Sequence, residues 1–309
     1  MITSRLFKLD FDRVHFGDGG LGASTTTVKA DTLFSALCHA ALRIGGTRTL
    51  EQVVQAVQTG QLRFTDLLPF VGETYLVPKP IAPVERRTSS AETASLVKKQ
   101  VKRISLVPVD DVATFLNGRA DLAEIANKQS QIGTSATLER VSVRTGGDDA
   151  EPYRVGIFRF APDSGLWVLA NGSVAEIELF EYLLAATPAL GGERTSGCGT
   201  FFYRAVAHPP AALSAVTAHP SVRSLLLTTA LPDDVELDHA LAGATYQLVR
   251  RGGFIASSSF AGTPRRKLDL YKIAAGSVFQ QGFSGVVADV GIGGSHPVWS
   301  YSKPLFLPL

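Results

Sequence analysis

The order of strand-like and helix-like segments constrains the fold of this 309-residue chain more than any other feature. The segment RLFKLDFDR alternates strictly, with Phe7, Leu9 and Phe11 on one face and polar side chains on the other, which is typical of a half-buried strand. A helix is predicted over DTLFSALCHAALRI, where Asp31 is a good N-cap residue and Gly45–Gly46 ends the helix.

Further segments complete a first unit. Strands are predicted in QLRFTDLL, YRVGIFRF, GLWVLA and TFFYRAVA, and a second helix in VAEIELFEYLLAA. Apart from one additional strand, this order matches the strand, helix, strand, strand, helix, strand of an α+β, ferredoxin-like (RRM-like) unit, an antiparallel sheet with both helices on one face. Residues 80–150 are rich in Ser, Thr, Lys, Arg and Gln, and we expect an insertion that projects from the body and is partly a hairpin.

A linker rich in Pro and Ala, HPPAALSAVTAHPS, precedes a second unit. This unit alternates short strand-like segments with one short helix, DDVELDHALAG, and we interpret it as a second, more degraded ferredoxin-like domain. The predicted domains are residues 1–208 and 209–309.

The net charge of +2 does not by itself indicate a nucleic-acid-binding protein. The positive charges are nevertheless unevenly spread. A charge run is usually a solvated face, but three basic clusters together with a glycine-rich loop favour an anionic partner. The clusters are Arg86, Arg87, Lys98, Lys99, Lys102 and Arg103; Arg250 and Arg251; and Arg265, Arg266 and Lys267.

Cysteine usage and the N-terminal residues bear on location and metal chemistry. Cys38 and Cys198 stand far apart without a CxxC spacing, so neither a zinc site nor a disulfide framework is supported. The start, MITSRLFKLDFDR, has alternating charges where a signal peptide would be apolar, and no apolar run is long enough to cross a bilayer. We expect a cytoplasmic protein without a cofactor.

No common catalytic motif stands out. A Walker loop, an HExxH motif and a GxSxG elbow are absent from the sequence. His15 ends the first strand and has two interpretations: a general acid or base for RNA cleavage, or a polar residue that contacts a partner or caps a loop. The second is favoured because no other catalytic group pairs with it.

The loop GGERTSGCG, residues 191–199, is the strongest functional signal. Its four glycines exceed what a turn needs, which suggests that something outside the chain approaches the loop. Successive amides in such a loop can form a concave site for an anion. Arg194 can bind a phosphate with two hydrogen bonds, and Thr195 and Ser196 can donate more. The alternative is a long, flexible connection between helix and strand.

Together these segments resemble one family, subunit four of the type III-A CRISPR effector known as the Csm complex. The family belongs to the RAMP superfamily, in the Cas5-like group by function. The resemblance runs from the first strand to the C-terminus, with residues 85–150 aligning loosely. It is carried by LDFDRVHFGDGGLGAS, ADTLFSALCHAAL, YLVPKPI, EPYRVGIFRFAPDSGLWVLA, GGERTSGCGTF, GGFIASSSFAG, RKLDLYKIAAGSVF and GGSHPVWSYSKPLFL, in that order.

The resemblance implies two ferredoxin-like domains, a thumb at roughly residues 80–150, and no catalysis. Such subunits cap the 5′ tag of the guide RNA and dock on the large polymerase-like subunit and on the first backbone RAMP subunit. The thumb would wedge at the first guide–target pair, near the target RNA. The implied tag-binding residues are His15, Lys29, Gly191, Gly192, Arg194, Thr195, Ser196, Gly197, Arg251, Ser257, Ser258 and His296.

The chain also departs from that family. The family's glycine loop often has a lysine where Glu193 stands, an aromatic residue at Cys198 and a basic residue at Thr200. Two other functions stay open: a metal-independent CRISPR RNA-processing endonuclease that uses His15, and a scaffold that touches only protein.

Overall fold

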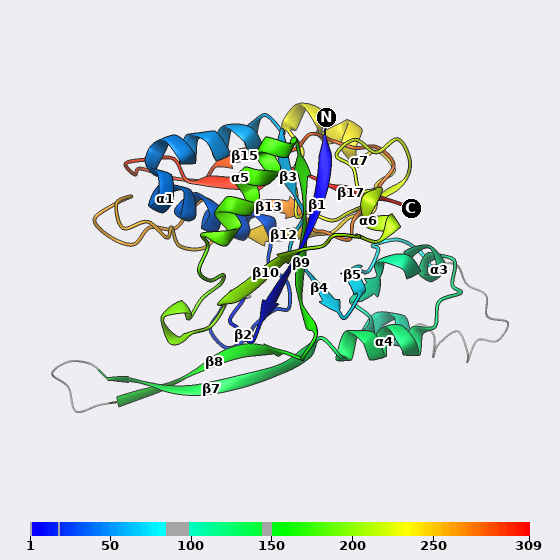
Figure 1. The fold of residues 1–309 in the computed structure, drawn as a ribbon, viewed down its shortest axis with the longest axis horizontal. Coiled ribbons are helices and arrows are strands. Elements are labelled where there is room, and N and C mark those ends of the chain that lie inside the picture. The colour runs from blue at the N-terminus through cyan, green and yellow to red at the C-terminus, as the bar shows by residue number, and fades with distance from the viewer. Residues whose placement is uncertain (1, 18, 85–98, 144–149) are drawn as a thin grey trace.

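The computed structural model describes residues 2–17, 19–84, 99–143 and 150–309 (Figure 1). The basic residues Arg86, Arg87 and Lys98 and parts of the predicted insertion lie outside the described residues. The described helices are α1 (Ala30–Gln58), α3 (Val112–Leu116), α4 (Leu122–Ser130), α5 (Val174–Ala185), α6 (Ala211–Ser214) and α7 (Leu237–Leu241), with 3-10 turns η1 (Val109–Asp111), η2 (Arg194–Ser196) and η3 (Asp234–Glu236).

The described strands include four of nine to eleven residues, all before the C-terminal third, where the strands have two to four residues. They are β1 (Thr3–Phe11), β2 (Arg13–Val14), β3 (Leu62–Phe64), β4 (Leu68–Val71), β5 (Thr74–Pro78), β6 (Leu106–Pro108), β7 (Gly133–Val143), β8 (Ala150–Phe160), β9 (Ser164–Gly172), β10 (Phe201–Ala205), β11 (Ser224–Leu226), β12 (Leu248–Arg251), β13 (Leu270–Ile273), β14 (Val278–Phe279), β15 (Val286–Asp289), β16 (Trp299–Ser302) and β17 (Phe306–Pro308).

A seven-stranded sheet organises the molecule. Its strand order is β10-β1-β9-β4-β5-β6, and β3 pairs with the far end of β9. The predicted succession of strand, helix, strand, strand, helix, strand is found at β1, α1, β3, β9, α5 and β10. Every named pairing is antiparallel, and α1 and α5 pack against each other on one side of the sheet (Figure 1). The chain is therefore a mixed α/β protein with antiparallel sheets.

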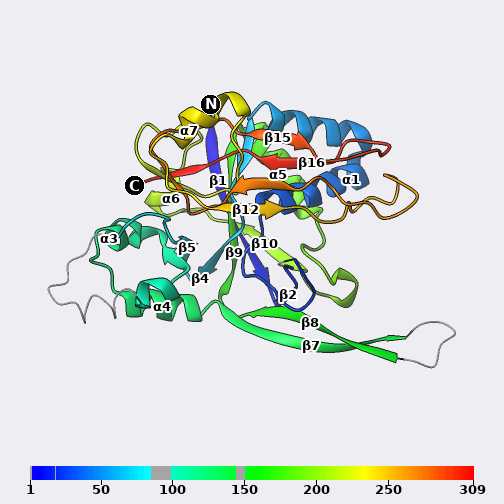
Figure 2. The same ribbon diagram turned by 180° about the vertical axis from the view of Figure 1, so that it is seen from behind.

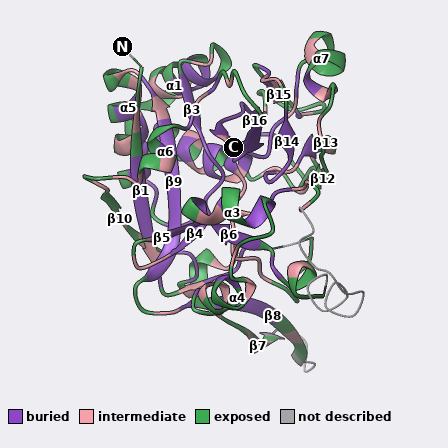
Figure 3. Cartoon of the chain, turned by 90° about the vertical axis from the view of Figure 1, so that its right-hand side faces the viewer, coloured by how far each residue is buried: buried purple, intermediate pink, exposed green. Residues whose placement is uncertain are grey.

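Both faces of this sheet are covered, so β1 and β9 are buried on two sides (Figure 3). On the helix side Phe7 and Val168 pack with Phe180, while on the other side Trp167 packs in a second cluster with α3 and α6. The expectation of a half-buried first strand is wrong at Lys8. Its ammonium group is buried and donates to the Gly72 carbonyl and the Glu73 carboxylate, each at 2.8 Å.

The regular conformation of the first helix is interrupted at the glycine pair, where the sequence predicts its end. Gly46 has φ 65° and ψ −159°, so α1 breaks there and continues as a second helical segment to Gln58. The predicted cap is wrong, because Lys29 is the N-cap residue and makes no side-chain cap. The Ala30 amide instead donates to the Asp66 carboxylate at 2.9 Å. The Asp31 side chain does not cap the helix and pairs with Arg251 and Lys272, as described below.

A long hairpin projects from the body, as Figures 1 and 2 show. It consists of β7 and β8, which pair from Gly133–Phe160 outward, and β2 extends the pairing at its base. A hairpin is expected within residues 80–150, but its second strand continues to Phe160. The segment YRVGIFRF therefore belongs to this separate three-stranded sheet, and only GLWVLA joins the central sheet.

The C-terminal third contains the predicted strands but not one continuous sheet. Its strands lie in three small sheets, β14-β11-β17, β12-β13 and β15-β16. This part shares cores with the first 208 residues. Tyr301 stacks on Phe64 with ring centroids 4.2 Å apart, and Leu225 and Leu305 join the cluster around Trp167.

A buried ion cluster joins α1 to β12 and β13. Arg251 makes two hydrogen bonds to the Asp31 carboxylate, at 2.7 and 3.0 Å, and Lys272 donates to it at 3.2 Å. Lys272 is fully buried and also donates to Ser300 and the Tyr301 carbonyl. Burial alone would raise the pKa of Asp31, but Lys272 and Arg251 outweigh it and hold that pKa well below its usual range.

Replacing Asp31 by Asn tests this cluster. The change leaves the Lys272 ammonium buried without a counter-charge, and we expect a loss of about 3–5 kcal/mol in the free energy of unfolding. Urea unfolding at pH 7 measures it. The matched control is Asp10→Asn, whose partner Arg204 is exposed, with an expected loss below about 1 kcal/mol. Equal losses in the two variants would contradict the assignment.

The same cluster predicts a pH dependence. The pKa of Asp31 is lower in the folded chain, so its contribution is present above the unfolded value of about 4 and is lost as the pH falls toward the folded value. Unfolding measured from pH 5 to pH 2 should show a shallower loss of stability in Asp31→Asn than in the unchanged protein.

Candidate nucleic-acid interface

The loop of residues 191–199 has a defined conformation between α5 and β10. The turn η2 lies between two residues in the left-handed region, Glu193 with φ 54° and Gly197 with φ 80°. Glu193 and Asp163 are the non-glycine residues with positive φ in the described part of the chain. Arg194 and Thr195 are exposed at the tip of the turn.

Three of the loop's glycines are required by the chain's own packing. An added Cβ would lie 2.6 Å from the His15 carbonyl oxygen at Gly191, 2.8 Å from the His15 ring at Gly192, and 1.9 Å from the Leu190 carbonyl oxygen at Gly199. Real Cβ atoms do not approach this closely, so these positions need glycine for close packing. The chain's own packing therefore accounts for these three glycines, and the approach of an external molecule to the loop stays a prediction.

Most amides of the loop are also engaged within the chain. Gly192 donates to the His15 carbonyl at 2.9 Å and Gly199 to the Arg13 carbonyl at 2.9 Å. The amides of Ser196 and Cys198 donate to the Glu193 carbonyl, and that of Gly197 to the Arg194 carbonyl. A continuous anion site made of free amides across this loop is therefore not present. What the loop offers to a ligand is the side chains on its tip.

His15 lies beneath the loop rather than at its surface. It is 5% exposed, and its Nδ1 donates to the Gly156 carbonyl on β8 at 2.7 Å. The Gly156 amide donates in turn to the Leu21 carbonyl. His15 thus ties the loop 191–199 to the base of the hairpin, as expected for a residue that holds loops together.

Arg194 lies close enough to His39 of α1 to act on its charge, and so does His296 of the C-terminal third. The pKa of His39 is lowered from its ordinary value, first by partial loss of solvent and then by the positive charges of Arg194, Arg43 and His296. Arg43 also donates to the Ala186 carbonyl at the end of α5. We call the two arginines Arg194 and Arg43, together with the neighbouring rings of His39 and His296, the α1 cationic cluster.

A cavity of about 350 Å³ opens beside this cluster. Its walls combine apolar side chains, among them Leu50 and Trp299, with Ser257 and the rings of His39 and His296. The His296 Nδ1 donates to the Pro297 carbonyl, so its Nε2 accepts from the Ser257 hydroxyl at 2.9 Å in the neutral ring. Ser258 is exposed next to it.

Two of the residues implied by the resemblance lie elsewhere. Lys29 forms an ion pair with the buried Asp66 at 3.4 Å, and Arg251 is held by Asp31. Both sit near the first turn of α1 and contribute to its anchoring. If Lys29 or Arg251 binds an external anion, that anion must compete with the carboxylate that the residue already contacts.

Three functional candidates were not identified from the sequence. His39 is exposed on α1. Its i, i+4 spacing with Arg43 was the available signal. Arg140 on β7 forms an ion pair with Glu193 at 3.5 Å, and no sequence signal links these two residues.

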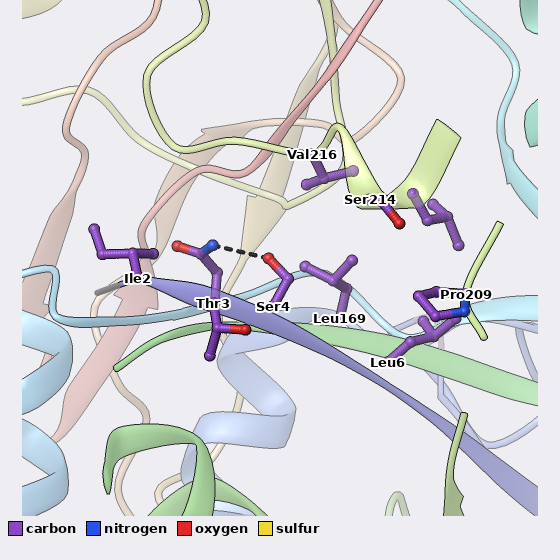
Figure 4. Close-up of a pocket in the computed structure, with 10 residues that line it drawn as sticks. Ile2, Thr3, Ser4, Leu6, Leu169, Pro209, Ser214 and Val216 are labelled. Atoms are coloured by element: carbon purple, nitrogen blue, oxygen red, sulfur yellow. Dashed lines mark hydrogen bonds between the residues drawn. The ribbon is translucent and has the colours of Figure 1, made fainter. Parts of the chain in front are cut away.

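A second cavity, of about 360 Å³, lies at the other end of β1 (Figure 4). Ser4, Leu169 and Pro209 are among its lining residues, and Asn171 donates to Ser4 at 2.9 Å. None of the residues implied by the resemblance lines it. Within the described ranges, no three His, Cys, Asp or Glu side chains are placed to bind a metal ion, and no helix is long and apolar enough to span a bilayer.

Comparison with known proteins adds to this geometry. A family model described as the CRISPR Csm4 C-terminal domain matches residues 219–309. The CRISPR system Cms protein Csm4 of Mycobacterium tuberculosis H37Rv is 51% identical over 308 residues, covering 100% of this chain and 98% of that protein. The protein of the same name from Streptococcus thermophilus is 32% identical over 313 residues, covering 100% and 99%.

Solved structures share the fold. The crystal structure of the Csm3–Csm4 subcomplex in the type III-A CRISPR–Cas interference complex matches with a TM-score of 0.66, 18% identity and coverage of 99% of both chains. The Csm1–Csm4 cassette in complex with cA4 matches with a TM-score of 0.59 and 19% identity, covering 99% and 98%. Fold and sequence together define a subunit of a type III-A CRISPR effector. The chain belongs to the Csm4 family.

Glycine substitutions test the packing explanation of the loop. Gly199→Ala places a Cβ against the Leu190 carbonyl at φ 79°, and we expect a loss of at least about 1 kcal/mol in the free energy of unfolding. Gly20→Ala is the control, because nothing lies within 4 Å of its Cβ position. Thermal unfolding of both variants checks this, and a loss no larger at Gly199 would refute the explanation.

Proposed function

We propose that this protein is a non-catalytic subunit that binds and caps the 5′ tag of the guide RNA in a type III-A CRISPR ribonucleoprotein serving antiviral or plasmid defence. The observation that carries the proposal is the α1 cationic cluster, where Arg194, Arg43 and His296 lie around His39, and both histidine rings line an open cavity. Two arginines near an apolar cavity suit a single-stranded RNA, since phosphates pair with the guanidinium groups and a base can enter the cavity.

The proposal also assigns roles to the parts of the fold. Residues 1–208 would form a ferredoxin-like domain, in which β10, β1, β9 and β3 lie side by side and α1 and α5 cover one face. Residues 209–309 would form a second, degraded domain of that kind. The β7–β8 hairpin would be the thumb, inserted at the first guide–target position and near the target RNA.

Partners and location follow from the family. Csm4 is combined with Csm3 in one solved structure and with Csm1 in another. We propose that this chain likewise docks on a backbone RAMP subunit and on the large polymerase-like subunit, in the cytoplasm. The RNA would then lie where the hairpin base, the loop 191–199 and the α1 cationic cluster meet.

The rival function is a metal-independent endonuclease that uses His15. The geometry does not favour it, because the His15 ring is buried and its Nδ1 is committed to the Gly156 carbonyl. A general acid or base must reach the proton it transfers. His15 here reaches the chain's own backbone.

Arg194 provides the direct test of the capping proposal. Arg194→Ala should weaken binding of tagged guide RNA about fivefold and reduce the salt slope by about 0.7, the value for one phosphate contact on a single strand. Fluorescence anisotropy across a salt series measures both. The double variant Arg194→Ala with Gly197→Ala, in which the alanine strains the loop at φ 80°, should lose most of the binding of tagged guide RNA.

The control for that experiment is Arg119→Ala, an exposed arginine between α3 and α4. It removes the same charge away from the loop and should leave affinity within about twofold. If the Arg194 and Gly197 double variant assembles with tagged RNA as the unchanged protein does, the loop does not bind the tag.

A cleavage assay distinguishes the rival. Repeat RNA incubated with the purified chain in EDTA should remain intact, since the buried His15 has no access to substrate. Gel analysis of labelled RNA shows this directly. Product that disappears in His15→Ala would establish the endonuclease instead.

A further inference from the structure

The carboxylate of Glu193 occupies an unusual place for an acid. It is the acidic residue of the loop 191–199, and its backbone adopts φ 54°, which costs a non-glycine residue free energy. The Ser196 hydroxyl lies 3.2 Å from a carboxylate oxygen and 3.0 Å from the Glu193 carbonyl oxygen, and Arg140 lies 3.5 Å from the same carboxylate oxygen. The chain thus holds a negative group in a strained backbone conformation within a cationic surface.

The groups that hold this carboxylate are the groups that bind phosphate. An arginine and a serine hydroxyl are common partners of phosphate oxygens in RNA complexes. Two more arginines flank them: Arg13 donates to the Ser196 carbonyl at 3.3 Å, and Arg194 lies in the same turn. These groups come from β2, β7 and η2, so the chain gathers them from three separate segments beside the hairpin.

The site is open enough for exchange. The side chains of Arg140 and Glu193 retain 28% and 21% of their exposure, so the ion pair is neither sealed from solvent nor fully screened by it. A phosphate that approached from solvent would meet the Arg140 guanidinium and the Ser196 hydroxyl after a rotation of the Glu193 side chain alone. Such a rotation leaves the backbone hydrogen bonds of the loop intact.

We propose that Arg140 and Ser196 form a phosphate site that Glu193 fills in the free protein, and that a phosphate of the bound RNA displaces the carboxylate. This inference rests on the proposed RNA-binding function and adds a residue, Arg140, to its interface. Because Arg140 belongs to β7, the phosphate would replace Glu193 as the link between the loop and the hairpin. Binding would therefore keep the hairpin attached to the loop.

Removing the carboxylate tests the exchange. Glu193→Gln should raise the affinity for a labelled single-stranded RNA about fivefold, the size expected for removing one competing, partly exposed ion pair. The matched control is Glu139→Gln, which removes an exposed acid paired with Arg154 on the same hairpin, and it should change affinity less than twofold. Glu193→Gly removes the carboxylate and also suits the positive φ, so it replaces Glu193→Gln should that variant fold poorly.

A double-mutant cycle separates the site from general electrostatics. In an Arg140→Gln background, the gain from Glu193→Gln should fall to the level of the Glu139→Gln control, because the carboxylate no longer competes for the Arg140 guanidinium. A gain that persists in that background would overturn the proposal, as would equal gains from Glu193→Gln and Glu139→Gln.

A second experiment distinguishes an RNA phosphate from free phosphate as the ligand of this site. Inorganic phosphate replaces RNA, and the rise in the thermal unfolding temperature is measured. If the unchanged chain binds RNA but Glu193→Gln gives no gain, this inference fails and the capping function stands. If no variant binds RNA but phosphate stabilises Glu193→Gln more than the unchanged chain, the site holds free phosphate and the capping function fails. Absence of both effects overturns both.

Discussion

Two buried carboxylates at the start of α1 fix the relation between the halves of this chain. Asp66, on the connection after β3, accepts from the Ala30 amide at the start of α1 and from the amide and hydroxyl of Thr229 in the C-terminal third. Asp31, one residue into the helix, receives Arg251 and Lys272 from β12 and β13. Because each charge is buried with its partner, neither carboxylate can move without leaving an uncompensated group in the core. The first turn of α1 is therefore the point from which the positions of both halves are set.

The candidate interface depends on that anchoring through short stretches of chain. Arg251 ends β12, and six residues later Ser257 lines the cavity beside the α1 cationic cluster. On the helix, His39 lies eight residues beyond Asp31, about 12 Å along the axis at 1.5 Å per residue. Holding Asp31 to Arg251 thus positions the loop and the helix face that form the two walls of the cavity. The ion pairs of Lys29 with Asp66 and of Arg251 with Asp31 therefore position the interface from behind, and both side chains are directed to these carboxylates.

Apolar periodicity predicted β1, α1, β3, β9, α5 and β10, which all occur where the spacing places them. It could not decide pairing. YRVGIFRF reads as a strand in either sheet, and only the register with β7 and the contact between Gly156 and His15 place it in the hairpin. The glycine loop was located correctly, but the packing need for its glycines could not be predicted, because a close approach to His15 and Leu190 depends on tertiary structure. The same limit applied to Glu193 and Arg140, which are far apart in sequence and paired across two elements.

The packing of the glycine loop changes the physical basis of its proposed binding. Amides that already donate to His15, Arg13 and Glu193 carbonyls cannot turn toward a phosphate without loss of those bonds. In exchange the loop is ordered before any ligand arrives, so little conformational entropy remains to be lost on binding. Recognition then falls to a few charged side chains on a rigid base, and such contacts position a nucleic acid by its backbone while carrying no sequence information. Selectivity for particular bases would have to come from the adjacent cavity, whose apolar walls and His296–Ser257 pair are the groups suited to a base rather than to a phosphate.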